Sequence, residues 1–170
     1  PFHVESALLA ELGDRLVSSP DVALTELVKN SFDADATYCK VSIKSKEIVV
    51  EDDGNGMRLD DFLNLWMVIG TRNKARNGLS ARFKRKVSGS KGIGRFAVRF
   101  LGEKMVLVTT AKDGKKTYRI TATFDWTAVE QDGDLQSVKV PYTVEEVSAD
   151  ERVGTTLRIS KLRASIDRSA

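Results

Sequence analysis

Three residues near the start of the chain combine side-chain types and spacing that suit phosphate chemistry. Glu26, Asn30 and Asp33 follow one another at intervals of four and three residues. A helix turns by about 100° per residue, so the three side chains share one face. Magnesium prefers oxygen ligands and keeps several waters, so the Asn30 amide and phosphate oxygens together suit it. A carboxylate one turn away, Glu26, can orient or deprotonate a water molecule. An ordinary solvated helix face has the same pattern.

A second motif, Glu51-Asp52-Asp53-Gly54-Asn55-Gly56-Met57, follows an apolar run. A buried carboxylate at the end of a strand can accept the exocyclic amine of adenine. Gly54 and Gly56 would let the backbone pass close to a ligand. Taken alone, the motif is equally typical of an Asp/Gly turn.

A third motif, Gly89-Ser90-Lys91-Gly92-Ile93-Gly94, opens a predicted helix. Backbone N–H groups at a helix N-terminus, with glycines that allow close approach, bind anions. The sequence contains no Walker loop. The residues before the glycines form a basic loop rather than a strand, which disfavours a dinucleotide fingerprint.

The last motif is Gly154-Thr155, which opens a late strand and offers a hydroxyl to a base or a bridging water. Strand propensity alone would also explain this threonine.

Positive charge is concentrated in one segment of the chain. The whole chain has a net charge of +3, yet residues 72–99 contain ten basic residues and no acidic one. Such a field suits a polyanion, either nucleotide phosphates or nucleic acid. For residues 82–86 a solvated, mobile loop is the competing interpretation.

Hydrophobic spacing predicts the elements that must position these motifs. Helices are expected at 4–17, at about 20–32 after a Ser19-Pro20 start, at 62–69 and from the glycines to 101. Strands are expected at 41–43, 48–50, 105–110, 117–124, 137–144 and 155–159. Residues 70–91 are predicted to form a long loop, and Asp113-Gly114 a hairpin turn.

This order of elements predicts a single domain over residues 1–170 with a two-layer α+β sandwich architecture. The sheet is expected to be mixed but largely antiparallel, with helices on one face. On the second helix, Leu24, Leu27, Val28 and Phe32 are predicted to pack into the core.

Composition narrows the function classes. Hydrophobic residues make up 41% and charged residues 30%, as in an ordinary globular protein, and no apolar run is long enough to cross a bilayer. A single cysteine, Cys39, favours a reducing, cytoplasmic setting. One cysteine and one histidine, His3, argue against a structural zinc site.

In combination and in this order, the motifs resemble the GHKL superfamily: gyrase B subunits, heat-shock chaperone ATPases, sensor histidine kinases and MutL proteins, with the MORC proteins close by. The resemblance covers about residues 22–159, and the helix sequence is closest to the chaperone, MutL and MORC versions. It implies the Bergerat-type ATP-binding fold, with a long ATP lid at about 70–95.

The resemblance also implies roles for individual residues. Glu26 matches the general base and Asn30 the magnesium ligand, while Asp52 matches the adenine-binding aspartate. The other matched nucleotide-binding positions are Asp33, Gly54, Gly56, Met57, Thr71, Lys74, Lys91, Gly92, Ile93, Gly94 and Thr155.

The function implied is binding of ATP and Mg²⁺ with hydrolysis, in which lid closure and homodimerisation act as a nucleotide-driven switch. In several relatives a following domain supplies a basic residue to the γ-phosphate. The chain is therefore expected to be a fragment of a longer protein and slow on its own. Two alternatives stay open: a histidine-kinase catalytic domain, and a DNA-binding ATPase module of a repair, silencing or defence protein that contacts DNA through the basic 72–99 segment.

Overall fold

The computed structural model describes residues 19–67, 78–87, 98–127 and 140–163. The first part contains helix α2 (Pro20–Asp33), strands β1 (Cys39–Ile43) and β2 (Glu47–Asp52), and a short helix α3 (Leu59–Asp61) that continues into a π-helix (Phe62–Trp66). Helix α4 (Val98–Leu101) then leads into β3 (Gly102–Asp113), β4 (Lys116–Asp125), β5 (Tyr142–Val147) and β6 (Gly154–Leu162). The helix expected at 4–17 lies outside the described residues.

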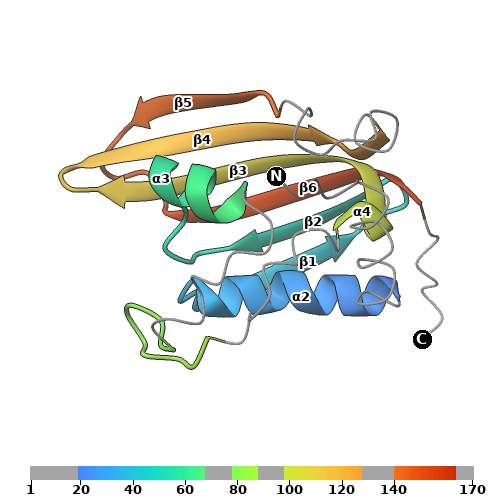
Figure 1. The fold of residues 1–170 in the computed structure, drawn as a ribbon, viewed down its shortest axis with the longest axis horizontal. Helices are drawn as coiled ribbons and strands as arrows, with labels where there is room; N and C mark the ends of the chain where they lie inside the picture. Colours follow the sequence, from blue (N-terminus) through green and yellow to red (C-terminus); the bar gives the residue numbers. More distant parts are fainter. Residues whose placement is uncertain (1–18, 68–77, 88–97, 128–139, 164–170) are drawn as a thin grey trace, which may run out of the picture.

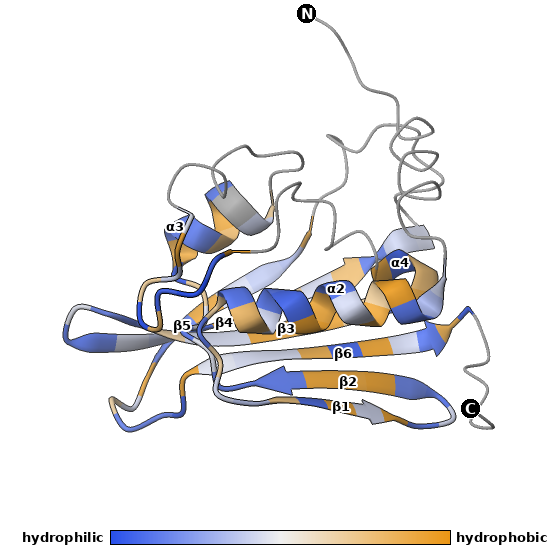
Figure 2. Ribbon diagram, turned by 90° about the horizontal axis from the view of Figure 1, so that it is seen from below, coloured by the Kyte–Doolittle hydropathy of each residue, from blue (hydrophilic) through white to orange (hydrophobic). Residues whose placement is uncertain are grey.

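The six strands form one sheet in the order β1-β2-β6-β3-β4-β5 (Figure 1). Every neighbouring pair is antiparallel. Figure 2 shows α2, α3 and α4 on the same face of this sheet. The predicted two-layer α+β sandwich is confirmed, and the sheet is fully antiparallel among the described strands rather than mixed.

Alternation along the strands builds the core on the helix-covered face. Val50, Leu157, Leu107 and Ala122 are paired across β2, β6, β3 and β4, and all four are buried. A second buried row, two residues along each strand, contains Ile48, Ile159, Met105 and Phe124. Side chains alternate between faces, so the residues two positions from the first row on its opposite side must also face the helices. These residues are Asp52, Thr155 and Thr109.

Helix α2 begins as the sequence predicts. Ser19 is the N-cap, and its hydroxyl accepts a hydrogen bond from the Val22 N–H at 3.4 Å, while Pro20 occupies the first turn, where its missing N–H costs nothing.

The predicted packing of α2 is partly wrong. Leu27 is buried with Ala23 and Ser31, but Val28 and Phe32 are 39% and 45% exposed. The buried stripe consists of Ala23, Leu27 and Ser31, which follow one another at intervals of four residues. It lies about a quarter-turn around the helix from the centre of the predicted buried face, and directly beside the stripe of Glu26 and Asn30.

One other element differs from expectation. The third helix is wound as a π-helix, closed by a hydrogen bond of 2.9 Å from the Met67 N–H to the Phe62 carbonyl. Phe62 is fully buried there, with its ring edge-on to Tyr142 at 5.5 Å. The hairpin between β3 and β4 is confirmed, with Gly114 at a positive φ of 62°. No helix within the described ranges is long and apolar enough to span a membrane.

Candidate nucleotide-binding site

The register of the sheet brings Asp52, Thr155 and Thr109 into one row. Asp52 on β2 is paired with Thr155 on β6, and Thr155 is paired with Thr109 on β3. This row continues the two apolar rows of the core on the helix-covered face. Polar side chains at inward positions of three adjacent strands mark the end of the apolar core, and this row is the candidate site.

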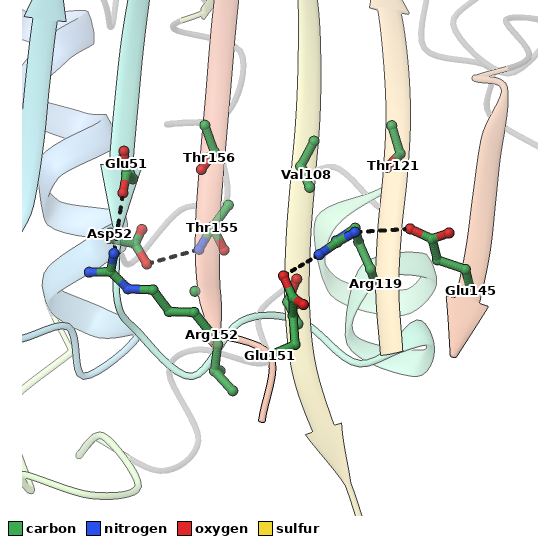
Figure 3. Close-up of a pocket in the computed structure, with 13 residues that line it drawn as sticks. Glu51, Asp52, Val108, Arg119, Thr121, Glu145, Glu151, Arg152, Thr155 and Thr156 are labelled. Atoms are coloured by element: carbon green, nitrogen blue, oxygen red, sulfur yellow. Dashed lines mark hydrogen bonds and ion pairs between the residues drawn. The ribbon is translucent and has the colours of Figure 1, made fainter. Parts of the chain in front are cut away.

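Asp52 is held by three donors. The Ser31 hydroxyl donates to Oδ2 at 2.8 Å, and the backbone N–H groups of Gly54 and Thr155 donate to Oδ1 at 2.9 and 3.2 Å. Figure 3 shows the Thr155 contact. Burial raises the pKa of the Asp52 carboxyl above its ordinary value, and these three hydrogen bonds oppose that rise.

Sequence reasoning missed Thr109, which is fully buried. Its hydroxyl lies 3.0 Å from that of Thr155 and accepts a hydrogen bond of 2.9 Å from the Met57 N–H. Thr109 therefore links β3, β6 and the loop after β2. Its position two residues beyond Leu107 in a predicted strand was the available signal, because a threonine continues an apolar, inward-facing series there.

Helix α2 contributes Ser31, Asn30 and Glu26. Ser31, which was also missed, occupies the buried stripe and reaches Asp52, while Asn30 and Glu26 are partly exposed beside that stripe. Glu26 forms an ion pair with Lys29, three residues further along the same helix, and the Lys29 ammonium donates a hydrogen bond of 2.7 Å to Oε1 of Glu26. Asp33 is partly exposed at the end of the helix.

The glycines after Asp52 fit the loop between the helix and the sheet. A Cβ on Gly54 would lie 2.8 Å from the Ala34 carbonyl oxygen, and one on Gly56 would overlap the carbonyl of Thr110. Gly56 also has a positive φ of 64°. At these glycines the backbone lies close to Ala34, the C-cap residue of α2, and to Thr110 of β3. The expected approach to a ligand stays a prediction.

A further residue that the sequence did not single out, Asp35, joins this loop to the basic segment. Asp35 is 1% exposed and has a φ of 61°. It accepts hydrogen bonds from the Ser80 hydroxyl, from the N–H groups of Arg82 and Phe83 at 2.6 and 3.1 Å, and from the Asn55 amide at 3.3 Å. Burial alone would raise the pKa of Asp35, but these hydrogen bonds outweigh it and lower the pKa to about 2.

Residues 82–86 are largely solvated, as the competing interpretation expects, but they belong to a hydrogen-bonded hairpin rather than to an unstructured loop. Residues 78–87 form a small hairpin with a bridge between Leu79 and Lys86, and two backbone N–H groups of this hairpin are bound to Asp35. We call this segment hairpin 78–87. A sequence pattern does not reveal a buried carboxylate that collects donors from 45 residues away.

A hollow of about 450 Å³ lies near the same end of the sheet (Figure 3). Its lining includes Val108, Thr121 and Thr156, which are paired with one another and lie on the face away from the helices. Asp52 and Thr155 of the inward row also border it. Arg119 in its lining contacts Glu145 and Glu151. Asp52 and Thr155 thus border both this hollow and the helix-covered side, where Ser31 binds Asp52 and Thr109 lies beside Thr155.

The remaining predicted site residues lie outside the described part of the chain. They are Thr71, Lys74, Lys91, Gly92, Ile93 and Gly94.

Comparison with known proteins gives three findings. Residues 17–155 match the family described as histidine kinase-, DNA gyrase B- and HSP90-like ATPase. A protein of Herpetosiphon aurantiacus described as a candidate type II restriction enzyme, HgiDII, is 38% identical over 91 residues, which are 52% of this chain and 14% of that protein. The crystal structure of the N-terminal domain of a DNA repair protein superposes with a TM-score of 0.54 at 20% identity, covering 88% of this chain and 38% of that one. The chain thus spans well under half of either protein, and the structural likeness speaks for the fold alone.

Proposed function

Because the chain belongs to the family of histidine kinase-, DNA gyrase B- and HSP90-like ATPases, we propose that it binds ATP with Mg²⁺ and hydrolyses the γ-phosphate. The observation that carries the proposal is the buried Asp52 carboxylate, in one row with Thr155 and Thr109 and tied to α2 through Ser31.

The donor set around Asp52 fits an adenine ring. A carboxylate offers about four acceptor positions, and three of these are used by Ser31, Gly54 and Thr155. An exocyclic amine can take the remaining one. Partly buried apolar side chains, Met57 and Cys39, flank the same end of the sheet and suit a flat ring.

The phosphate side of the proposal rests on α2. Asn30 would supply an amide oxygen to magnesium, with Asp33 one turn further along the helix. Magnesium, when bound, neutralises charge on the phosphate oxygens. Glu26, one turn before Asn30, would accept the proton of a water that attacks the γ-phosphorus. The bond between that phosphorus and the bridging oxygen breaks, and ADP and phosphate leave.

We further propose that the residues between 70 and 95 act as the ATP lid. Thr71, Lys74, Lys91, Gly92, Ile93 and Gly94 would contact the nucleotide from it. Lid closure and homodimerisation in the full-length protein would then form a nucleotide-driven switch.

Binding is tested by titrating a non-hydrolysable ATP analogue, with and without magnesium, into wild type and Asp52→Asn. We expect magnesium-dependent binding that is lost in Asp52→Asn. Asp53→Asn is the matched control, because Asp53 is the adjacent carboxylate and binds Thr37 and the Tyr38 N–H instead. Full binding by Asp52→Asn would overturn the adenine assignment.

Hydrolysis is tested separately in the full-length protein. We expect Glu26→Ala to keep analogue binding and to lose turnover. Unchanged turnover would exclude Glu26 as the base, and transfer of labelled γ-phosphate to a protein histidine would favour the kinase alternative.

A second candidate function is DNA handling by the same module. Residues 72–99 contain ten basic residues and no acidic one. The name of one relative also refers to restriction. Salt-dependent binding to DNA would support this function, and equal affinity at 50 and 200 mM salt would argue against phosphate contacts.

A further inference from the structure

We propose that hairpin 78–87 is the surface of this module that contacts the phosphate backbone of duplex DNA. This inference extends the DNA-handling function proposed above. It concerns one described segment of the basic region and does not depend on ATP binding.

Hairpin 78–87 is a fixed structure rather than a flexible tail. The Ser80 N–H donates to the Arg85 carbonyl at 2.8 Å, and the Val87 N–H donates to the Gly78 carbonyl at 3.0 Å. The Ser80 hydroxyl accepts from the Arg85 N–H at 2.9 Å and donates to Asp35. Asp35 thus binds the turn of the hairpin through the Ser80 hydroxyl and two backbone N–H groups. The hairpin lies just beyond the C-terminal end of α2 (Figure 1, light green segment).

One cation of the hairpin is used internally. Arg85 donates to the carbonyls of Phe32 and Ala36 at 3.2 and 2.8 Å, and its guanidinium lies over the rings of Phe32 and Phe83 at 4.6 Å each. It therefore fastens the hairpin to α2, and it is the least exposed of the basic side chains there.

The other three cations point outward. Arg82, Lys84 and Lys86 are exposed, and within the described residues none of them forms an ion pair with a carboxylate. In the part of the chain that the structure describes, Asp35 is the only carboxylate bound to the hairpin; it is buried and already accepts four hydrogen bonds. The surface thus offers three unneutralised charges within five residues, held on a rigid support.

The arginines that stack on the aromatic rings indicate that the hairpin contacts the phosphate backbone of DNA rather than its bases. Phe83 is exposed, but Arg82 and Arg85 lie over its ring at 4.5 and 4.6 Å. Phe32 is covered in the same way by Arg85. Rings that already stack on guanidinium groups are not free platforms for unpaired bases. Three closely spaced, exposed cations instead match the closely spaced phosphates of a duplex.

The test is duplex DNA of mixed sequence, titrated into the full-length protein at several salt concentrations. The hairpin variant carries Arg82→Gln, Lys84→Gln and Lys86→Gln, which leave the backbone hydrogen bonds to Asp35 intact. The matched control carries Lys46→Gln, Lys112→Gln and Lys115→Gln. These three lysines are also exposed and likewise have no carboxylate partner within the described ranges, so both variants lose the same charge.

We expect the hairpin variant to bind duplex DNA about tenfold or more weakly. The slope of log affinity against log salt should fall by about three, one for each lost contact. The control should bind duplex DNA nearly as well as wild type, and its ATP-analogue affinity should be unchanged.

Three results would overturn the proposal: no duplex binding by wild type, equal binding by wild type and the hairpin variant, or an equal loss in the control. A loss of ATP-analogue affinity in the hairpin variant would instead assign these cations to nucleotide phosphates. Failure of the ATP proposal itself would appear as absent analogue binding in wild type, which leaves the DNA result readable.

Discussion

The hydroxyl of Ser31 donates a hydrogen bond of 2.8 Å to Oδ2 of Asp52. This contact joins the buried stripe of α2 to the end of β2. It spans 21 residues of sequence and connects the two layers of the fold at the candidate site. Two motifs that look separate in the sequence, the helix and the Asp-Gly loop, therefore share one polar contact.

Replacing Ser31 with alanine should destabilise the protein by about 1–3 kcal/mol, because a buried carboxylate then loses one of its three donors. The same loss should raise the pKa of Asp52 further, since the Ser31 hydrogen bond lowers it. Urea unfolding measures the first effect, and carboxyl NMR titration measures the second. Ser45→Ala, at an exposed turn position, is the control. Equal stability of the two variants would contradict the proposed importance of the contact.

Asp35 should contribute stability that disappears in acid. Its pKa in the folded protein is lowered from 3.8 to about 2. A lowered pKa means that the unfolded chain binds the proton first, so this stability is complete above pH 3.8 and is lost as pH falls toward 2. Asp35→Asn should therefore cost about 2 kcal/mol at neutral pH, and the difference from wild type should shrink in acid.

The measurement is the free energy of unfolding of both proteins between pH 5 and 2. Hydrogen exchange at the Arg82 and Phe83 amides gives a local readout, because both donate to Asp35. We expect faster exchange there in Asp35→Asn. A gap between the proteins that stays constant with pH would count against an ionised Asp35.

A comparison of Gly56 with Gly114 separates the free-energy cost of an unfavourable backbone conformation from the cost of steric overlap. Both have positive φ values, 64° and 62°, but only a Cβ on Gly56 would meet other atoms, those of Thr110 and Ala111. Gly114→Ala should cost about 1–2 kcal/mol for its backbone conformation alone. Gly56→Ala should cost about 1–3 kcal/mol more, because the loop must move away from β3. Thermal unfolding of the two variants compares these costs, and similar values would mean that the loop relaxes freely.

Lys29 tests whether its ion pair with Glu26 matters for turnover. The pair is partly exposed, and such pairs contribute about 0–1 kcal/mol. Lys29→Ala should therefore change turnover of the full-length protein by less than about fivefold, whereas Glu26→Ala removes it. Steady-state phosphate release measures both variants. A loss in Lys29→Ala as deep as in Glu26→Ala would make the ion pair, rather than the carboxylate, the functional unit.

Much of the fold could be predicted from the sequence because it rests on local patterns. The Ser19-Pro20 start of α2, the alternation in β1, the apolar run of β2 and the glycine turn at Gly114 each involve a few consecutive residues. The π-helix and the extra length of β3 could not be predicted, since both depend on the packing of distant neighbours.

The residues of the candidate site also divide into those that a local sequence pattern identifies and those that depend on distant neighbours. Asp52 and Thr155 could be identified from their motifs, and the structure brings them together. Ser31, Thr109 and Asp35 carry no motif of their own. Their importance comes from which groups lie across from them: a carboxylate for Ser31, a backbone N–H for Thr109 and the turn of hairpin 78–87 for Asp35. Those pairings become visible only when the register of the sheet and the path of the loop are known.

The position of β6 has a consequence for biosynthesis. The strand that comes last among the described residues lies between β2 and β3. Until Gly154–Leu162 has been made, the sheet therefore exists as the β1-β2 hairpin and a separate three-stranded unit, β3-β4-β5. The N–H of Thr155 on that strand also completes the hydrogen bonds of Asp52. Long-range pairing of this kind is slow to form. A growing chain should therefore expose the unpaired edges of β2 and β3, and it should acquire its candidate nucleotide site only when β6 is made. The period before β6 is complete is thus the one in which this domain most needs protection from aggregation.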